Sequence, residues 1–259
     1  MTPSDATHQR ELALALELAD IADHITLPLF RSTGLRVDSK PDATPVTEAD
    51  RGAEDALRRH LATARPEHAV VGEEYGTKGT APWRWIIDPV DGTKNFVRGI
   101  PVWATLIALQ HEELGVVGVA SAPALGRRWW AVAGGGAFAD GRRIHVSSTD
   151  RLEDATLSYD SVPGFGGRAL EERFLDLLHR CGRSRGLGDF WSHALVAEGA
   201  VDIAVEPEVS LWDLAALQVI VEEAGGRLTD LGGQARADGG SVVTSNGLLH
   251  DAVLQALRP

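Results

Sequence analysis

Apolar residues at helical spacing open the chain. Within residues 8–30, Leu12, Leu16, Ala19 and Ala22 follow one another at three- to four-residue intervals, and this period predicts a helix that buries one face. Beyond it, the pattern up to about residue 150 predicts mostly strands. The expected elements are a polar loop at 36–46, a helix from about Glu48 to Ala64, a short strand at Ala69–Val71, a loop at 77–82, a strand at Trp83–Ile87, strands within 103–110 and 114–123, and a β-meander over 127–147.

The pattern changes after about residue 150, where strands alternate with helices. The expected elements are a strand at 155–160, helices at Glu171–Cys181 and Ser192–Gly199, a strand at 200–207, a helix at 211–226 that ends in glycine, and a strand and closing helix in the last thirty residues. We therefore predict an α/β (α+β) fold in a single domain over 1–259. It would have two lobes, an antiparallel-rich α+β lobe over about 1–148 and an α/β lobe over about 149–259.

Composition and charge narrow the possible partners. The chain has 259 residues, of which 44% are hydrophobic and 24% charged, so it is long enough to form a sizeable core. Its formal net charge of −12 makes nucleic acid and anionic membranes poor partners. The longest basic clusters are pairs such as Arg127-Arg128. We therefore expect neither a nucleic-acid partner nor a membrane partner.

Cysteine content and the N-terminal residues bear on the cellular compartment. Cys181 is the single cysteine, which excludes an intrachain disulfide framework and a cysteine-rich zinc site. Asp5 and Glu11 stand where a signal peptide would carry basic residues before an apolar stretch. No uninterrupted apolar run approaches the ~20 residues of a membrane span. These features predict a cytoplasmic protein.

Carboxylates occur where apolar segments meet loops. In WIIDPVDGTKNF, residues 85–96, an apolar run stops at Asp88 and a second aspartate follows at Asp91. Similar positions are held by Asp50, Glu73 and Asp213. Each of these acids therefore stands where an apolar element meets a loop.

Each of these acids also has a structural explanation. The segments TEAD, ending at Asp50, and SLWD, ending at Asp213, both fit a helix capping box. Glu73 is typical of a solvated strand end, and the Asp88–Asp91 segment is typical of a tight turn. A cap does not exclude a metal ligand, however, because a helix N-terminus stabilises a carboxylate as the anion that a metal requires.

The residues around Asp88 and Asp91 add the other parts of a phosphoryl-transfer site. Hard cations such as Mg²⁺ prefer oxygen ligands and keep waters for a substrate phosphate. Pro89 removes a backbone N–H, so a carbonyl between the two aspartates is left free as a ligand. Gly92 lets a phosphate approach the amides at the following helix start, and Thr93 supplies a hydroxyl. The pattern therefore predicts metal-assisted chemistry on a phosphate.

Four ordered motifs resemble one known family over essentially the whole chain. WIIDPVDGTKNFVR is similar throughout to the first signature of the inositol monophosphatase family, and WDLAALQVIVEEAGG is similar to the second, with Leu217 where a small residue is usual. GEE at 72–74 and TPVTEAD at 44–50 occur in the family's order and spacing. The resemblance implies a layered αβαβα sandwich of the inositol monophosphatase/fructose-1,6-bisphosphatase type, usually a homodimer, and Mg²⁺-dependent hydrolysis of phosphate monoesters.

The resemblance also implies a role for each acid, with two to three Mg²⁺ ions in the site. Asp91 would bridge two ions, and Asp50 would help to hold a third, weaker one. The ligand set implied for the ions is Glu73, Asp88, the Val90 carbonyl, Asp91, Asp213 and Asp50. Thr93, together with Glu73, would orient the attacking water, so Glu73, Thr93 and Asp91 are the expected catalytic residues. The backbone amides of Gly92 and Thr93 would bind the phosphate. In such a two-metal scheme one ion activates water and the other stabilises the leaving alkoxide.

The second half of the chain bears on the substrate, a small phosphorylated metabolite. Segments such as SAPALGRRWW and EPEVSLWDLAAL look most like the bacterial histidinol-phosphatases of the family. Histidinol phosphate carries an ammonium group and an imidazole, which carboxylates and tryptophan can recognise. Expected substrate contacts are Gly92, Thr93, Asp189, Trp191, Glu206 and Asp213, with Glu208 nearby. Lys94 departs from the threonine that is common in inositol phosphatases.

Other interpretations of this half stay open. Phe190 and Trp191 could be core residues that open a helix, with the acids merely solvated, and His193 fits a packed helix position better than a ligand. Within the same enzyme class, the alternative is an inositol-1-monophosphatase or a broad-specificity phosphomonoesterase. A non-catalytic, protein-binding relative is the alternative from another class. The acidic charge and the intact ligand set argue against it.

Overall fold

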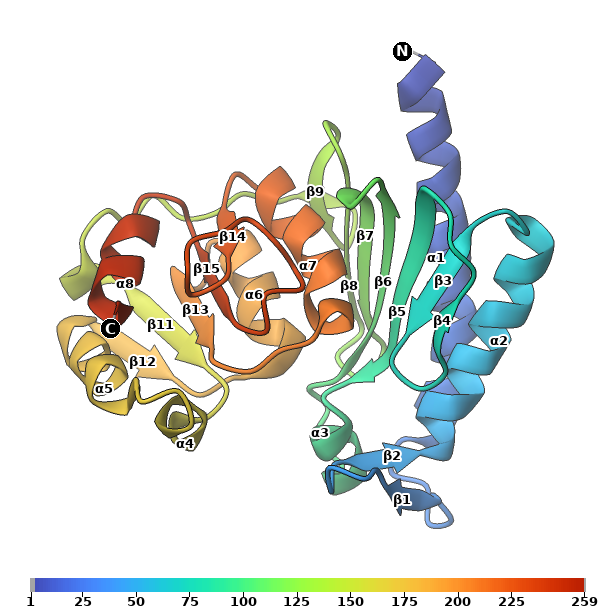
Figure 1. Ribbon diagram of the computed structural model, residues 1–259, viewed down its shortest axis with the longest axis horizontal. Coiled ribbons are helices and arrows are strands. Elements are labelled where there is room, and N and C mark those ends of the chain that lie inside the picture. Colours follow the sequence, from blue (N-terminus) through green and yellow to red (C-terminus); the bar gives the residue numbers. More distant parts are fainter. Residues whose placement is uncertain (1–2, 259) are drawn as a thin grey trace.

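The computed structural model describes residues 3–258, which form alternating layers of helices and sheets (Figure 1). The layers run in the order helices, 8-stranded sheet, helices, 5-stranded sheet, helices, which confirms the αβαβα sandwich expected from the sequence. The helices are α1 (Pro3–Leu29), α2 (Glu48–Ala64), α3 (Thr93–Arg98), α4 (Val162–Gly166), α5 (Glu171–Arg180), α6 (Asp189–Ala197), α7 (Leu211–Glu223) and α8 (His250–Leu257), with a 3₁₀ turn at Leu152–Asp154.

The larger sheet has the strand order β10-β9-β8-β7-β6-β5-β3-β4. Its neighbours pair antiparallel except for β3 and β5, which run parallel. Helices α1 and α2 cover one face through a shared apolar cluster that includes Leu18, Leu57 and Ile107. The strands are β3 (Ala69–Gly72), β4 (Gly76–Lys78), β5 (Trp83–Asp91), β6 (Ala104–His111), β7 (Leu114–Ala122), β8 (Arg127–Val132), β9 (Gly136–Ala139) and β10 (Arg142–Arg143).

The smaller sheet has the strand order β12-β11-β13-β15-β14. Strand β11 runs parallel to both of its neighbours, β12 and β13, whereas the pairs that include β15 are antiparallel. Its outer face packs on α4, α5 and α8 through a cluster that includes Phe174 and Leu254. The strands are β11 (Thr156–Tyr159), β12 (Arg183–Arg185), β13 (Ile203–Glu206), β14 (Arg227–Thr229) and β15 (Val242–Ser245).

Helices α6 and α7 fill the space between the two sheets (Figure 1). Helix α7 is apolar around most of its circumference, as expected for a largely buried helix. Residues such as Leu214 and Ile220 are almost fully buried, whereas Glu222 near the end of the helix is exposed. All strands of the larger sheet precede residue 148 and all strands of the smaller sheet follow it. Because α7 packs on the larger sheet, the division of the chain into two lobes stays a prediction.

Several elements differ from those expected. The segment 36–46 is not a plain loop, because β1 (Val37–Ser39) and β2 (Pro45–Thr47) form a hairpin. The loop expected at 77–82 begins with the end of β4. Both β1 and β4 are exposed at every position, so they carry no apolar alternation that sequence inspection could detect. Helix α6 begins at Asp189, three residues before the expected start.

The strand that ends in the acidic motif is longer than expected. Strand β5 continues past Ile87 to Asp91, and its pairing with β6 shifts register between Asp88 and Asp91. This irregularity is a bulge, which a proline within a strand favours because it lacks the N–H for a regular ladder. Bulges re-aim side chains, so β5 can direct both aspartates to one side. None of the helices in the described part of the chain combines the length and apolar character that crossing a membrane requires.

Candidate active site

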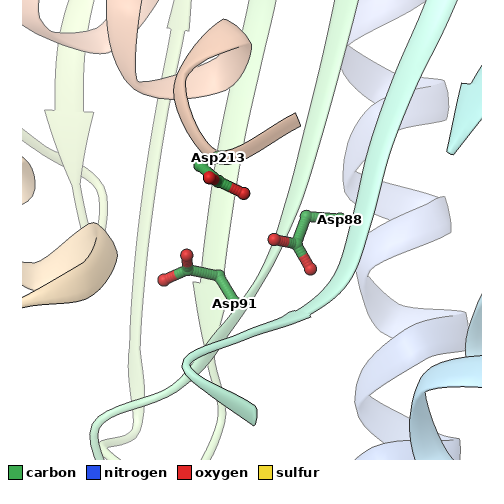
Figure 2. Close-up of side chains that lie close together, drawn as sticks. All are labelled: Asp88, Asp91 and Asp213. Atoms are coloured by element: carbon green, nitrogen blue, oxygen red, sulfur yellow. The ribbon is translucent and has the colours of Figure 1, made fainter. Parts of the chain in front are cut away.

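Three aspartates from two distant segments converge beside the larger sheet. Figure 2 shows Asp88 and Asp91 at the end of β5 and Asp213 at the start of α7, with their carboxyl groups facing a common space. One carboxylate oxygen from each lies within 4.8 Å of the others. The Val90 N–H donates to Asp88 Oδ1 at 3.0 Å, which holds this carboxylate in the bend of the bulge. This arrangement presents several oxygen donors to a single ion.

Asp213 and Asp50 serve as helix caps, as the sequence predicted. At the start of α7, Ser210 N donates to Asp213 Oδ2 at 2.7 Å, and at the start of α2, Thr47 N donates to Asp50 Oδ2 at 2.8 Å. Both capping boxes are complete. Each cap uses one carboxylate oxygen, so Asp213 keeps its second oxygen for the space shared with Asp88.

Thr93 connects the end of β5 to the buried Asp50. Its hydroxyl Oγ1 lies 2.9 Å from the Val90 carbonyl and 3.2 Å from Asp50 Oδ1. Asp50 itself is fully buried. The hydroxyl thus has two hydrogen-bond acceptors within reach, and these contacts hold the Thr93 side chain in one orientation.

Glu73 enters the site from the end of β3 and is held by a lysine. Lys40 Nζ donates to Glu73 Oε1 at 2.6 Å and lies 2.7 Å from Glu74 Oε1. Lys40 belongs to the turn of the β1–β2 hairpin, which therefore reaches the site. Lys40 is not predicted by the sequence pattern, because a single lysine in a polar segment carries no periodic signal.

A cavity of about 490 Å³ brings most of the predicted residues together. The predicted residues that line it are Glu73, Asp88, Val90, Asp91, Gly92, Thr93, Asp189, Glu206 and Asp213. Asp50 does not line the cavity and contacts it through Thr93. The lining residues that were not predicted from the sequence include Lys40, Asp160, His193 and Trp212.

Trp191 does not reach the cavity. Its side chain packs against the apolar cluster between the two sheets, whereas Trp212 lines the cavity. Phe190 is fully buried, and its ring packs edge-on against Trp129 with centroids 5.8 Å apart. Phe190 is therefore a core residue that also lines part of the cavity wall, and Trp191 is partly buried and packs against the same core.

Glu206, at the end of β13, and His193, in α6, belong to one wall of the cavity. His193 Nε2 lies 3.3 Å from Glu206 Oε1, and His193 Nδ1 lies 2.8 Å from Thr244 Oγ1. His193 is almost fully buried, as its packed helix position predicted. Its ring nevertheless borders the cavity, so it combines packing with a polar contact to Glu206.

Four of the aspartates that line the cavity resist ionisation. Burial, followed by repulsion from Glu73, raises the pKa of Asp88 well above its ordinary value. Burial, followed by repulsion from Asp189, does the same to the pKa of Asp91. Burial is also the main reason why the pKa values of Asp189 and Asp213 rise to about 7.

Such crowding of buried carboxylates favours the binding of a cation. Desolvation and mutual repulsion make each anion costly until an opposite charge offsets them. The donors of Asp88, Asp91 and Asp213 are all carboxylate oxygens, which suits a hard divalent ion better than a soft transition metal. The acidic cluster therefore fits the metal dependence expected for this site.

A buried glutamate outside the predicted set shapes the turn that carries Glu73. Glu54 accepts hydrogen bonds from Glu74 N at 2.7 Å and from Tyr75 N at 3.2 Å, and Arg58 Nε donates to it at 2.7 Å. A Cβ atom at Gly72 would lie 2.1 Å from Glu54 Oε1. Glycine is therefore required at position 72 for this carboxylate to sit beneath the turn.

We expect Gly72→Ala to destabilise the fold and to weaken metal binding. Overpacking against a fixed buried group typically costs about 1–3 kcal/mol, and displacement of the turn would move Glu73. The free energy of unfolding, measured with urea in the presence and absence of MgCl₂, should fall, and the gain from Mg²⁺ should shrink. Gly34→Ala is the matched control, because no atom lies within 4 Å of a Cβ there. Equal stability of the two variants would contradict this role of Gly72.

Comparison with known proteins agrees with the geometry of the site. Residues 8–259 match the inositol monophosphatase family. A histidinol-phosphatase from Mycobacterium tuberculosis is 56% identical over 95% of this chain and 97% of its own length, and one from Streptomyces coelicolor is 51% identical over 94% and 95%. The structure of an inositol monophosphatase from Zymomonas mobilis superposes with a TM-score of 0.87 at 34% identity, covering 96% of this chain and 98% of that one. The chain belongs to the inositol monophosphatase family.

Proposed function

We propose that the protein is a Mg²⁺-dependent phosphate monoester hydrolase that converts L-histidinol phosphate to L-histidinol and phosphate in histidine biosynthesis. The observation that carries the proposal is the second acidic region of the cavity. Asp160, Asp189 and Glu206 line the cavity in addition to the Asp88–Asp91–Asp213 cluster, and Glu206 and Asp160 both lie close enough to repel the Asp189 carboxylate. The three clustered aspartates suit metal ions, and the other three carboxylates suit a cationic leaving group. The names of the M. tuberculosis and S. coelicolor relatives support the same substrate.

In this proposal the acidic cluster holds two Mg²⁺ ions, and a third, weaker ion binds near Asp50. The ligands are Glu73, Asp88, the Val90 carbonyl, Asp91 and Asp213. When bound, the ions would lower the pKa of a water molecule and offset the charge of the phosphate and the leaving oxygen. Since Asp50 is buried and lies 3.2 Å from the Thr93 hydroxyl, it also supports Thr93.

The chain's own groups position the reactants. Thr93 Oγ1 and the Glu73 carboxylate are proposed to orient the attacking water. A water that is already oriented loses less translational and rotational entropy on reaching the transition state. The backbone amides of Gly92 and Thr93 are proposed to bind the phosphate at the start of α3. No side chain is required as a covalent nucleophile in this scheme.

The leaving-group region would recognise both cationic and aromatic parts of histidinol phosphate. The ammonium group is proposed to pair with Asp189 or Glu206, with Asp160 close to both. Trp212, rather than Trp191, is the tryptophan that borders the cavity, so it is the better candidate for contact with the imidazole. A cation over an indole face is stabilised by the ring quadrupole.

We expect Asp189→Asn to impair histidinol phosphate turnover selectively. A charge-assisted hydrogen bond contributes roughly 1.5–3 kcal/mol, which corresponds to a loss of about 10- to 150-fold in kcat/KM. Glycerol 2-phosphate, which has no cation, should be hydrolysed almost as before. Phosphate release from both substrates measures the contrast, and an equal loss for both would show damage to the metal site instead.

Phosphate release from a panel of substrates separates the alternatives. Histidinol phosphate, inositol 1-phosphate, fructose 1,6-bisphosphate and phosphoadenosine phosphate would each be tested with Mg²⁺. Inositol 1-phosphate hydrolysis as fast as that of histidinol phosphate would favour an inositol-1-monophosphatase or a broad phosphomonoesterase. No metal-dependent hydrolysis of any substrate would favour a protein-binding role. A homodimer is proposed from the family resemblance, and light scattering on the purified protein would measure the mass.

A further inference from the structure

The carboxamide of Asn95 joins three segments around the cavity. Asn95 belongs to the first turn of α3. Its Nδ2 donates to Asp189 Oδ2 at 2.8 Å and to the Val102 carbonyl at 2.9 Å. Both hydrogens of the amide nitrogen therefore have acceptors. The contacts tie the helix after the phosphate-binding turn to the segment before β6 and to the start of α6.

The position of Asp189 depends closely on these contacts. Its backbone has a positive φ of 49°, a conformation that non-glycine residues adopt infrequently. A Cβ atom at Gly92 would lie 3.4 Å from Asp189 Oδ2 and 3.0 Å from the Val102 carbonyl. The carboxylate is thus packed against the backbone of the phosphate-binding turn and has little room to move while Asn95 holds it.

The first turn of α6 also contacts Asp91, one of the three clustered aspartates. The Phe190 N–H donates to Asp91 Oδ2 at 2.8 Å. Asp189 and Phe190 are consecutive, so a shift of the Asp189 backbone would disturb this bond. A shift confined to the Asp189 side chain would leave it in place. A shift of the Asp189 backbone would therefore also disturb Asp91, whereas a shift of the Asp189 side chain would not.

Charged neighbours act on the Asp189 carboxylate in opposite senses. Glu206 and Asp160 repel its carboxylate, whereas Lys94 attracts it. Lys94 is exposed and also lines the cavity, but among the described residues no hydrogen bond from it fixes the Asp189 carboxylate in one orientation. The hydrogen bond from the neutral Asn95 holds the carboxylate in the cavity and adds no charge of its own.

We propose that Asn95 is a positioning residue that fixes the Asp189 carboxylate for contact with the cationic leaving group of the substrate. This inference rests on the proposed function, because it assigns to Asn95 the preference for a cationic substrate over an uncharged one. Asn95 acts through Asp189 and does not touch the reacting atoms. Its effect therefore falls on KM for histidinol phosphate more than on kcat.

The first test compares Asn95→Ala with a matched asparagine variant. Asn95→Ala should lower kcat/KM for histidinol phosphate by about 10-fold, the lower end expected for a hydrogen bond to a charged group, with little change for glycerol 2-phosphate. Asn246 also donates through Nδ2 to two acceptors, Ser147 Oγ at 3.0 Å and the Thr149 carbonyl at 2.7 Å. Asn246→Ala should lower the melting temperature without changing the ratio of the two kcat/KM values.

An isosteric variant and a double variant make the test decisive. Asn95→Asp keeps the shape of the side chain but replaces the donor with an acceptor that repels Asp189, so its loss of selectivity should exceed that of Asn95→Ala. In the double variant Asn95→Ala/Asp189→Asn, selectivity should fall no further than in Asp189→Asn alone, because the two residues act as one unit. Additive losses, or equal losses for both substrates in either Asn95 variant, would overturn the inference.

The outcomes separate this inference from the proposed function. If Asp189→Asn reduces selectivity and the Asn95 variants do not, only the role of Asn95 is wrong. If Asp189→Asn itself leaves selectivity unchanged, the proposed leaving-group contact is wrong and the inference is overturned with it.

Discussion

Asp91→Asn is expected to abolish nearly all phosphate release from histidinol phosphate, even in saturating MgCl₂. Asp91 faces both Asp88 and Asp213, so the substitution removes a charge from the centre of the proposed metal site. The amide oxygen can still accept the hydrogen bond from Phe190 N, so the fold should persist. Phosphate release at increasing MgCl₂ measures the loss. Full activity at saturation would contradict the ligand assignment.

Stability measurements give the Asp91 experiment a readout independent of activity. Burial and repulsion raise the pKa of Asp91, so its ionised form destabilises the metal-free fold at neutral pH. Metal-free Asp91→Asn should therefore be at least as stable as the wild type. A ligand that binds only the folded state raises the melting temperature, and this gain from Mg²⁺ should largely vanish in the variant. Chelation should abolish wild-type activity, and Mg²⁺ should restore it.

A buried aspartate outside the cavity provides the control for Asp91→Asn. Asp202 is 7% exposed and accepts a hydrogen bond from Thr156 N at 2.6 Å. Asp202→Asn should lower stability while it preserves both activity and the Mg²⁺-induced rise in melting temperature. Loss of the Mg²⁺ response in both variants would mean that the response reports general damage to the fold.

Local sequence patterns predicted the parts of the site that depend on neighbouring residues. The capping boxes at Asp50 and Asp213 involve groups three residues apart, and their chemistry is visible in the sequence. Asp88 and Asp91 lie on one strand, where Pro89 indicates an interruption of regular pairing. These short-range rules, added to the family motifs, were sufficient to predict that Asp88, Asp91 and Asp213 lie together, and these three aspartates line one cavity, whereas Asp50 contacts it through Thr93.

Contacts between distant residues left no comparable trace in the sequence. Lys40 meets Glu73 from a hairpin whose first strand is fully exposed, and Glu54 supports a turn that follows it by about twenty residues. The contact from Asn95 to Asp189 spans 94 positions. Spacing and periodicity do not encode such pairs, because they form only when separate elements pack together.

The misplaced tryptophan has a local cause. The expected helix began at Ser192, but α6 begins at Asp189 after a glycine with a positive φ of 70°. The earlier start places Trp191 within the first turn of the helix, where it packs into the core. The side chain of Asp189 accepts a hydrogen bond from Asn95, and a Cβ atom at Gly92 would lie 3.4 Å from its Oδ2. Neither residue is adjacent to Asp189 in sequence. The cavity-lining Trp212 lies instead beside the predicted ligand Asp213.

Thr93→Ala is expected to lower kcat for histidinol phosphate by ~10²–10⁴-fold, the usual range when a group that orients or activates a nucleophile is lost. The Thr93 hydroxyl is fixed by contacts with Val90 and Asp50, so its oxygen is preorganised to hold a water molecule. The effect on KM should be smaller, because the backbone amide of residue 93 remains available to the phosphate. Steady-state kinetics at saturating Mg²⁺ measures both constants.

Thr93→Ser is the matched control for that experiment, since it keeps the hydroxyl and removes only a methyl group. It should retain most of the wild-type kcat, whereas Thr93→Ala should not. The kcat of Asp50→Asn should lie between the values for Thr93→Ser and Thr93→Ala. An amide oxygen can still accept a hydrogen bond from the Thr93 hydroxyl, but it carries no charge to polarise that hydroxyl. A loss confined to KM in Thr93→Ala would show that the residue only binds phosphate. The orienting role would then fall to Glu73, which lines the same cavity.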